Sequence, residues 1–237
     1  MRTVLAIDTS TDVASLALMR GDDFVWEREI PSQRSHSAAL FPALMEAADQ
    51  GCSIDRIAVG LGPGSFAGIR IAIAAAMGLR AVWKCELVGL PSVLGLAAPS
   101  ESYMALGDAR RGTWYYSRVE TGECLDGPRL IETDADLQQL LSGNPLASGF
   151  ENEEVRLRSA LQAAVDQPSD SASSPGQSTE ALALFSTDAV ALRWGAQLRR
   201  PSAQFLARLA YSEKSLWQRH ELEPLYLREP HITLPKT

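Results

Sequence analysis

A short polar turn near the start of the chain could bind a phosphate group. It follows the apolar run of residues 3–7 and consists of small polar side chains: Asp8, Thr9, Ser10 and Thr11. Hydroxyl groups and backbone amides in such a turn can surround an anion. The four residues alone favour an ordinary polar hairpin, so a phosphate-binding turn is the alternative hypothesis.

A glycine-rich segment, residues 62–70, is the second candidate for phosphate binding. It joins a predicted strand to a predicted helix, with Ser65 as the expected N-cap. Glycine permits a ligand to approach the backbone closely, and the start of a helix attracts anions. The spacing of Gly62, Gly64 and Gly68 matches neither Gly-x-Gly-x-x-Gly nor the Walker A loop, which needs Gly-Lys-Ser/Thr. A rigid strand-to-helix turn explains the segment equally well.

A third polar turn, residues 108–112, contains one acid and two arginines: Asp108, Arg110 and Arg111. Arginine can hold an anionic group through two parallel hydrogen bonds. The commoner interpretation is a solvated turn with a local ion pair.

Metal and disulfide chemistry are not predicted. No Cys-x-x-Cys occurs, and three cysteines lie far apart: Cys52, Cys85 and Cys124. The histidines lack the spacing of helical metal ligands: His36, His220 and His231. We expect free thiols and no metal site.

Composition restricts the classes of function. The chain has 237 residues, a net charge of −7 and a pI near 5.1. Free-standing nucleic-acid-binding proteins usually carry a basic surface, so this balance argues against that role. No apolar run approaches the roughly 18 residues that span a bilayer, and the first residues do not resemble a signal peptide. We expect a cytoplasmic protein without membrane contact.

The apolar pattern predicts an α/β protein with two lobes. In the first lobe, residues 1–101, short turns should connect three strands into an antiparallel meander at residues 3–7, 13–19 and 24–29. Helices and strands then alternate, with helices at 37–48 and 66–83 and strands at 56–60 and 86–90.

The second lobe, residues 102–237, repeats the strand–turn–strand order. Strands are expected at 103–108, 113–119 and 129–132, and a helix follows that Thr133 or Asp134 caps. Residues 181–198 are ambiguous between helix and strand.

The end of the second lobe contains two kinds of segment. The Ser-rich stretch at about 167–178 predicts a mobile loop, because it has too few apolar side chains to offset the entropy of ordering. The tail, about 201–237, could return to the first lobe. Pro201 is expected as the first residue of a helix that ends near Tyr211.

Taken together, five segments resemble the TsaB (YeaZ) family. They are Ala6–Thr11, Arg34–Ser37 with Leu40–Pro42, Gly62–Ile71, Asp108–Gly112 and Glu223–Arg228. The glycine-rich segment is the most specific of them. The resemblance is strong over residues 1–118 and 201–229, and it is weak from about 120 to 200.

The resemblance implies a fold of the actin, hexokinase and Hsp70 type and a role in making tRNA threonylcarbamoyladenosine. The implied partner is TsaD, which transfers a threonylcarbamoyl group to N6 of adenosine 37 in tRNAs reading ANN codons. TsaE, a small ATPase, joins the two. ATP and metal would then belong to the partner subunits, this chain would carry no cofactor of its own, and it would meet tRNA only through the complex.

The resemblance also implies that this chain has no catalytic residues. TsaD-type subunits have a His-x-x-x-His metal pair where this chain has Ser92 and Leu96, and leucine cannot bind a metal. The Gly-Gly loop of the catalytic subunit is also missing, and the polar turns would be vestigial phosphate loops. The alternative is an enzyme of the same fold, either a small-molecule phosphotransferase or a glycoprotease-like peptidase. Nucleotide or metal binding by the isolated chain would distinguish the two.

The two first-lobe helices are the expected contact surface for the partner. The resemblance implies that they form a four-helix bundle with the matching helices of TsaD, and small side chains would permit close approach. The candidate interface residues are Leu40, Phe41, Leu44, Met45, Gly68, Ala72, Ala75, Ala76 and Leu79. The alternative is that they form the chain's own core, and the sequence does not decide which of them face outward. Without TsaD, an exposed patch of this kind should produce a homodimer.

Overall fold

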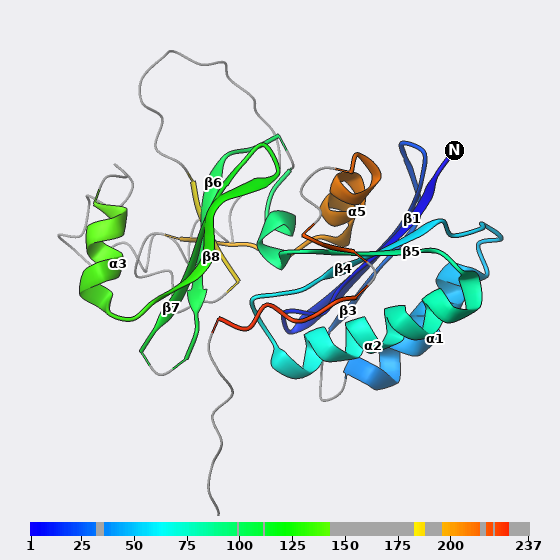
Figure 1. The fold of residues 1–237 in the computed structure, drawn as a ribbon, viewed down its shortest axis with the longest axis horizontal. Helices are drawn as coiled ribbons and strands as arrows, with labels where there is room; N and C mark the ends of the chain where they lie inside the picture. Colours follow the sequence, from blue (N-terminus) through cyan, green and yellow to red (C-terminus); the bar gives the residue numbers. More distant parts are fainter. Residues whose placement is uncertain are drawn as a thin grey trace, which may run out of the picture.

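The structure is a computed structural model of the chain, and it consists of two β-sheets that lie side by side, each covered by helices (Figure 1). It describes residues 1–31, 36–98, 100–110, 112–142, 183–187, 196–213, 217–219 and 221–227. Arg111 and the predicted loop at 167–178 lie outside these residues.

The first sheet has the strand order β11-β5-β4-β1-β2-β3. Strands β1 (Thr3–Asp8), β2 (Val13–Arg20) and β3 (Asp23–Pro31) pair antiparallel, which confirms the predicted meander. Strands β4 (Arg56–Gly60) and β5 (Glu86–Leu90) run parallel to β1. The short strand β11 (Gln218–Arg219) joins β5 from the end of the chain.

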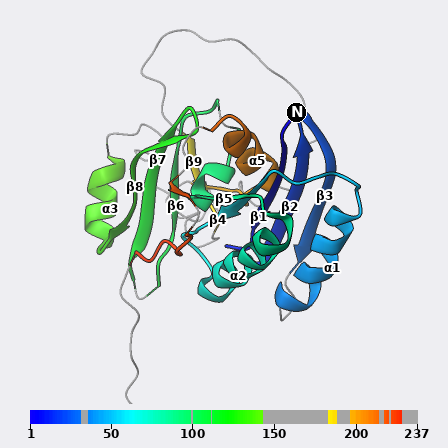
Figure 2. The same cartoon turned by 45° about the vertical axis from the view of Figure 1, so that its right-hand side comes forward.

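Helices cover both faces of this sheet (Figure 2). On one face lie α1 (His36–Ala48) and α2 (Phe66–Trp83), and on the other lies α5 (Ala203–Tyr211). Burial on two faces explains why β1 and β4 are apolar without alternation. The predicted N-cap of α2 is confirmed, since Ser65 Oγ accepts a hydrogen bond from the Gly68 amide at 3.2 Å.

Helix α2 is apolar around most of its circumference. Its 18 residues have a mean hydropathy of 1.5, so by length and composition alone it could cross a membrane, which corrects the expectation that no segment approaches that length; 33% of the segment is buried inside the chain. Core helices of globular proteins share these properties. The side chains of Ala72 and Ala76 are 0% exposed against the first sheet, so one face of α2 is a core face.

The second sheet has the strand order β10-β9-β6-β7-β8. Its antiparallel part consists of β6 (Tyr103–Asp108), β7 (Trp114–Glu120) and β8 (Glu123–Ile131), and β8 is longer than the predicted strand at 129–132. Within the ambiguous stretch 181–198, the described residues form β9 (Ala183–Ser186) and β10 (Gln197–Leu198). Helix α3 (Asp134–Leu141) begins as predicted, because Thr133 Oγ1 caps the Asp136 amide at 3.1 Å.

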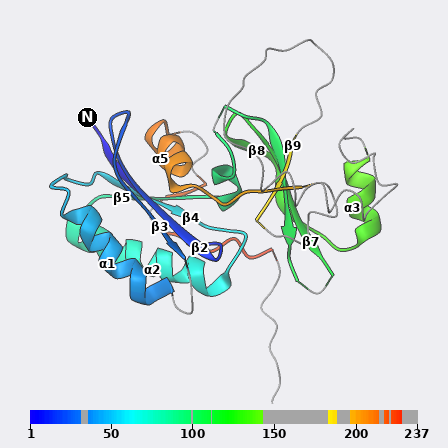
Figure 3. The same cartoon turned by 180° about the vertical axis from the view of Figure 1, so that it is seen from behind.

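One apolar core joins the two lobes. Helix α5 and the 3-10 helix η1 (Ser92–Gly95) lie between the sheets (Figure 3). The core around them contains Val4 and Ala17 from the first sheet and Tyr103 and Phe185 from the second. The Tyr103 hydroxyl also donates to the Val93 carbonyl at 2.6 Å. Separating the lobes would therefore expose buried apolar surface.

The start of α5 corrects one expectation. Pro201 is not its first residue, because the helix begins at Ala203. Residue Ser202 stays extended, with ψ at 125°, and its amide donates to the Gly95 carbonyl at 2.8 Å. This bond to η1 delays the helix by two residues.

Candidate functional site

The first two candidate phosphate loops lie in direct contact. Thr9 Oγ1 donates to the Gly68 carbonyl at 2.7 Å, and the Ser65 amide donates to the Ser10 carbonyl at 2.7 Å. The turn between β1 and β2 is thereby fixed to the start of α2. Two segments that are far apart in the sequence form one unit, as a shared site would require.

The glycines of this unit make backbone-to-backbone contact possible. A Cβ on Gly64 would stand 2.2 Å from the Ser10 carbonyl oxygen, and a Cβ on Gly68 would stand 2.1 Å from that of Thr9. Gly64 also has φ at +157°, which L side chains rarely adopt. The segment therefore fits the interpretation of a rigid strand-to-helix turn.

Several hydrogen-bond donors of this unit are used within the chain. The amides of Ser10, Gly62 and Gly68 donate to Asp8 Oδ1, Ser92 Oγ and Ser65 Oγ. Donors used in this way are not available to a phosphate without rearrangement. The geometry thus favours packing of the turns over anion binding.

Replacement of Gly68 by alanine is expected to destabilise the chain by about 1–3 kcal/mol, because the added methyl group meets the Thr9 backbone. This loss occurs although alanine is the better helix former by about 1 kcal/mol. The matched control is Gly78→Ala in the same helix, where nothing lies within 4 Å of the added Cβ. That control should stabilise the chain by about 0.5–1 kcal/mol. Urea denaturation of both variants measures the difference, and equal effects would contradict the contact.

Asp8 lies at the centre of the unit and is 1% exposed. The Ser10 amide and hydroxyl donate to its Oδ1 at 2.9 and 2.6 Å. Burial raises the pKa of Asp8 above its ordinary value, and hydrogen bonds from Ser10 and from the Ser92 hydroxyl partly oppose this shift.

The third candidate turn is an exposed loop of the second lobe. Asp108 Oδ1 accepts from the Arg110 amide at 2.6 Å, and the Arg110 side chain is 84% exposed with a distant ion pair to Asp108 at 3.5 Å. This geometry matches a solvated turn with a local ion pair. Within the described residues, no hydrogen bond connects this turn to the first-lobe unit.

The nine candidate interface residues divide between the core and the surface. Seven are buried or half-buried inside the chain, where α1 and α2 pack on the first sheet: Leu40, Leu44, Gly68, Ala72, Ala75, Ala76 and Leu79. Only Phe41 and Met45 are exposed, at 56% and 60%. The expectation that the small residues of α2 offer a docking face is therefore wrong. They permit α2 to approach its own sheet.

A different stripe of α2 faces outward. Ala74, Met77 and Gly78 are exposed, with Met77 at 52%, and they lie at helical spacing on the side opposite to Ala72 and Ala76. We call five of the exposed residues on α1 and α2 the outer helical face: Phe41, Met45, Ala74, Met77 and Gly78. The sequence pattern does not reveal the α2 part of this face, because α2 is apolar on both sides. The apolar character all around the helix was the available signal.

The end of the chain touches the start of α2. Arg70 Nε donates to the Tyr226 hydroxyl at 2.8 Å, and the Arg70 guanidinium lies 4.0 Å from the centre of the Phe66 ring. The Leu225 amide donates to the Leu61 carbonyl at 2.8 Å. The tail therefore holds the entry to α2 in place.

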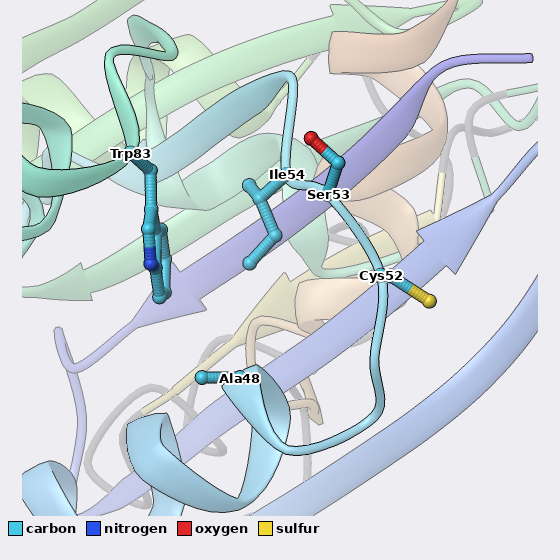
Figure 4. A pocket seen from close by; sticks show the side chains of 5 residues that line it. All are labelled: Ala48, Cys52, Ser53, Ile54 and Trp83. Carbon is cyan, nitrogen blue, oxygen red and sulfur yellow. The ribbon is translucent and has the colours of Figure 1, made fainter.

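A small pocket of about 110 Å³ lies between the ends of α1 and α2 (Figure 4). Ala48, Ile54 and Trp83 line it with Cys52 and Ser53, and the Cys52 sulfur points away from the Trp83 ring. Its lining has no acid or base. Among the residues that the structure describes, no group of three or more His, Cys, Asp or Glu side chains could hold a metal ion.

The comparisons with known proteins agree with one another. A family model described as "TsaD: tRNA N6-adenosine threonylcarbamoyltransferase" matches residues 30–215. The "tRNA threonylcarbamoyladenosine biosynthesis protein TsaB" of Haemophilus influenzae is 27% identical over 95% of this chain and 93% of its own length. The Escherichia coli protein of the same name is 30% identical over 51% of this chain and 56% of its own length.

A solved structure, "YeaZ from Pseudomonas aeruginosa", has a TM-score of 0.61 at 23% identity, covering 96% of this chain and 100% of that one. The two mixed sheets flanked by helices and this likeness define a two-lobed protein of the actin, hexokinase and Hsp70 type. The chain belongs to the family that the TsaD model describes, and within it to the TsaB (YeaZ) proteins.

Proposed function

We propose that the chain is a non-catalytic dimerisation subunit of the bacterial complex that transfers threonylcarbamoyl to N6 of adenosine 37 in tRNAs reading ANN codons. It binds and activates TsaD, and TsaE joins them. The Haemophilus relative, which matches over 95% of the chain, is named as a biosynthesis protein for this nucleoside, and this name supports the pathway.

The outer helical face is the observation that carries the proposal. Phe41, Met45 and Met77 are all more than half exposed, although their side chains are large and apolar. An exposed apolar patch of this kind is typical of a surface that binds another protein. Ala74 and Gly78 lie beside Met77 and allow a second helix to approach closely.

The occupant that fits this face is a pair of helices, which would complete a four-helix bundle. TsaD supplies the pair in the working complex. In its absence, a second copy of the chain occupies the same face, so the homodimer and the TsaD complex exclude each other.

The positions of Ser92 and Leu96 support the absence of a catalytic centre. Ser92 is 1% exposed and its Oγ accepts from the Gly62 amide at 2.9 Å, while Leu96 is 2% exposed in the core between the lobes. Both side chains have structural roles where the catalytic relatives would bind a metal. We therefore assign ATP and metal to the partner subunits, tRNA contact to the complex, and the chain itself to the cytoplasm.

Reconstitution tests the proposal. TsaD, TsaE, tRNA, threonine, bicarbonate, ATP and the enzyme that makes threonylcarbamoyl-adenylate are mixed with and without the chain, and the modified nucleoside is measured by mass spectrometry. We expect modification only when the chain and TsaD are both present. Modification without the chain, or with the chain in place of TsaD, would contradict the proposal and favour an independent enzyme.

A further inference from the structure

One buried carboxylate oxygen in the first lobe has no partner. Asp8 Oδ1 accepts two hydrogen bonds from Ser10, but Oδ2 is the one buried side-chain oxygen or nitrogen in the described residues without a partner at hydrogen-bond geometry. Buried polar atoms without a partner are rare in native proteins, because each costs free energy. Such an atom calls for a physical reason.

The Ser92 hydroxyl group lies in the same space above Gly60 as Oδ2. A Cβ on Gly60 would stand 1.9 Å from Asp8 Oδ2 and 2.7 Å from Ser92 Oγ, so both oxygens share the space above Gly60. Ser92 Oγ already accepts from the Gly62 amide at 2.9 Å. A hydroxyl group has two lone pairs and one hydrogen, so Ser92 can accept a second hydrogen bond from Asp8 or donate one to it.

The charged side chains of the surrounding elements engage other groups. Asp12, in the same turn, pairs with Arg200 on the surface. Arg56 of β4 pairs with Glu86 and Glu213, and Arg70 of α2 contacts Phe66 and Tyr226. Within the described residues of β1, β4, α2 and η1, no cation compensates a charge on Asp8.

A charged carboxylate here would be buried without a counter-ion, which is costly, and a hydrogen bond from the Ser92 hydroxyl would offset only part of that cost. We propose that Asp8 is an uncharged carboxylic acid in the folded chain, with its proton on Oδ2 directed at Ser92 Oγ. The proton removes the charge and turns Oδ2 from an acceptor into a donor. Burial, which raises the pKa of Asp8, agrees with this arrangement.

With this arrangement, the stability of the contact between the turn and α2 depends on pH. Thr9 and Ser10 bind the start of α2 through Gly68 and Ser65, so the protonated Asp8 lies beneath the contact that fixes this helix. A proton that the folded state retains and the unfolded state releases favours folding at low pH. The stabilisation from this proton is fully present below the ordinary carboxyl pKa of the unfolded chain. It falls as pH rises and is lost once pH exceeds the pKa of Asp8 in the folded chain.

Two measurements test the proposal. The first is denaturation of the wild type, Asp8→Asn and the exposed control Asp12→Asn between pH 5 and pH 8. The asparagine amide is uncharged and supplies a donor, as the neutral carboxylic acid does. We therefore expect the folding equilibrium constant of Asp8→Asn, relative to that of the wild type, to rise by up to tenfold for each unit of increasing pH. Asp12→Asn should keep the wild-type profile. If Asp8→Asn is less stable than the wild type by the same free energy at every pH, the proposal is overturned.

The second measurement does not depend on the folding of an Asp8 variant. The Asp8 carboxyl carbon is followed by NMR during a pH titration of the wild type and of Ser92→Ala. Loss of an acceptor for the carboxylic proton should lower the titration midpoint. A higher midpoint in Ser92→Ala would show that Ser92 donates to a charged carboxylate, which would overturn the proposal, as would a wild-type midpoint in the ordinary carboxyl range.

Discussion

Arginine at Ala74 and Met77 is expected to weaken binding to TsaD at least 100-fold, about 2.7 kcal/mol, while the chain keeps its stability. Both side chains lie on the outer helical face, and both are exposed in the isolated chain. In the proposed bundle they would be buried, where a guanidinium group without a partner is costly and too large. Titration calorimetry with TsaD measures the affinity, and sedimentation measures loss of the homodimer.

Two control substitutions make this result interpretable. Gln139→Arg adds the same side chain to an exposed position of α3 in the second lobe, and it should leave the affinity for TsaD unchanged. Ala72→Arg places the side chain at a position of α2 that is 0% exposed, and it should unfold the first lobe. If Ala74→Arg with Met77→Arg is folded and binds TsaD normally, the docking surface lies elsewhere on the molecule.

Arg56→Ala is expected to lower the free energy of unfolding by about 3 kcal/mol, because truncating a large buried side chain leaves a cavity and removes the hydrogen bonds of its guanidinium. Arg56 is 1% exposed in the middle of the first lobe. Its Nε donates to Glu86 at 2.8 Å, its Nη2 donates to Glu213 at 2.9 Å, and its Nη1 donates to the Ala210 carbonyl. Removal of this guanidinium takes one donor from the Ala210 carbonyl and one of two paired arginines from each of Glu86 and Glu213.

Two further arginines, one near the start of the first lobe and one on β11, pair with the same two glutamates. Arg2 pairs with Glu213 at 2.6 Å, and Arg219 pairs with Glu86 at 2.8 Å. Hydrogen bonds from Arg2 and then Arg56 lower the pKa of Glu213 to about 2. The stability from this lowered pKa is present above the ordinary carboxyl range and is lost as pH falls through about 2.

Urea denaturation at neutral and acid pH measures the Arg56 effect. Arg56→Lys keeps the positive charge but loses the planar guanidinium with its several fixed donors. It should therefore retain only part of the free energy that Arg56 contributes to unfolding. Arg56→Met fills the same space without charge. If Arg56→Met equals the wild type in stability at neutral pH, the network contributes packing volume only, and the ion-pair argument fails.

Local patterns predicted most of the first lobe to within one or two residues. Alternating apolar runs, the Ser65 cap and the polar turn at Asp8 are all signals within a few residues of the elements that they define. The bond from Ser202 to Gly95, which moved the start of α5, joins residues far apart in the sequence. No local pattern reports such a contact.

The orientation of α2 could not be predicted for a related reason. The stripe with Ala72 and Ala76 and the stripe with Ala74 and Gly78 are both small and apolar, so composition does not distinguish the core side from the outer side. Arg56 shows the same limit, because an arginine inside a predicted strand usually indicates an exposed side chain. Its partners lie on β5 and after α5, and only the tertiary structure brings them together.

The first sheet receives its last strand, β11, and the helix on its second face, α5, from residues 203–219. During synthesis on the ribosome, residues 1–101 therefore emerge about 100 residues before the elements that cover them. Until those elements are made, one face of the first sheet stays exposed. A nascent or truncated chain that ends before residue 203 cannot complete the first lobe. The order of translation thus delays completion of the second face of the first sheet until residues 203–219 have been made.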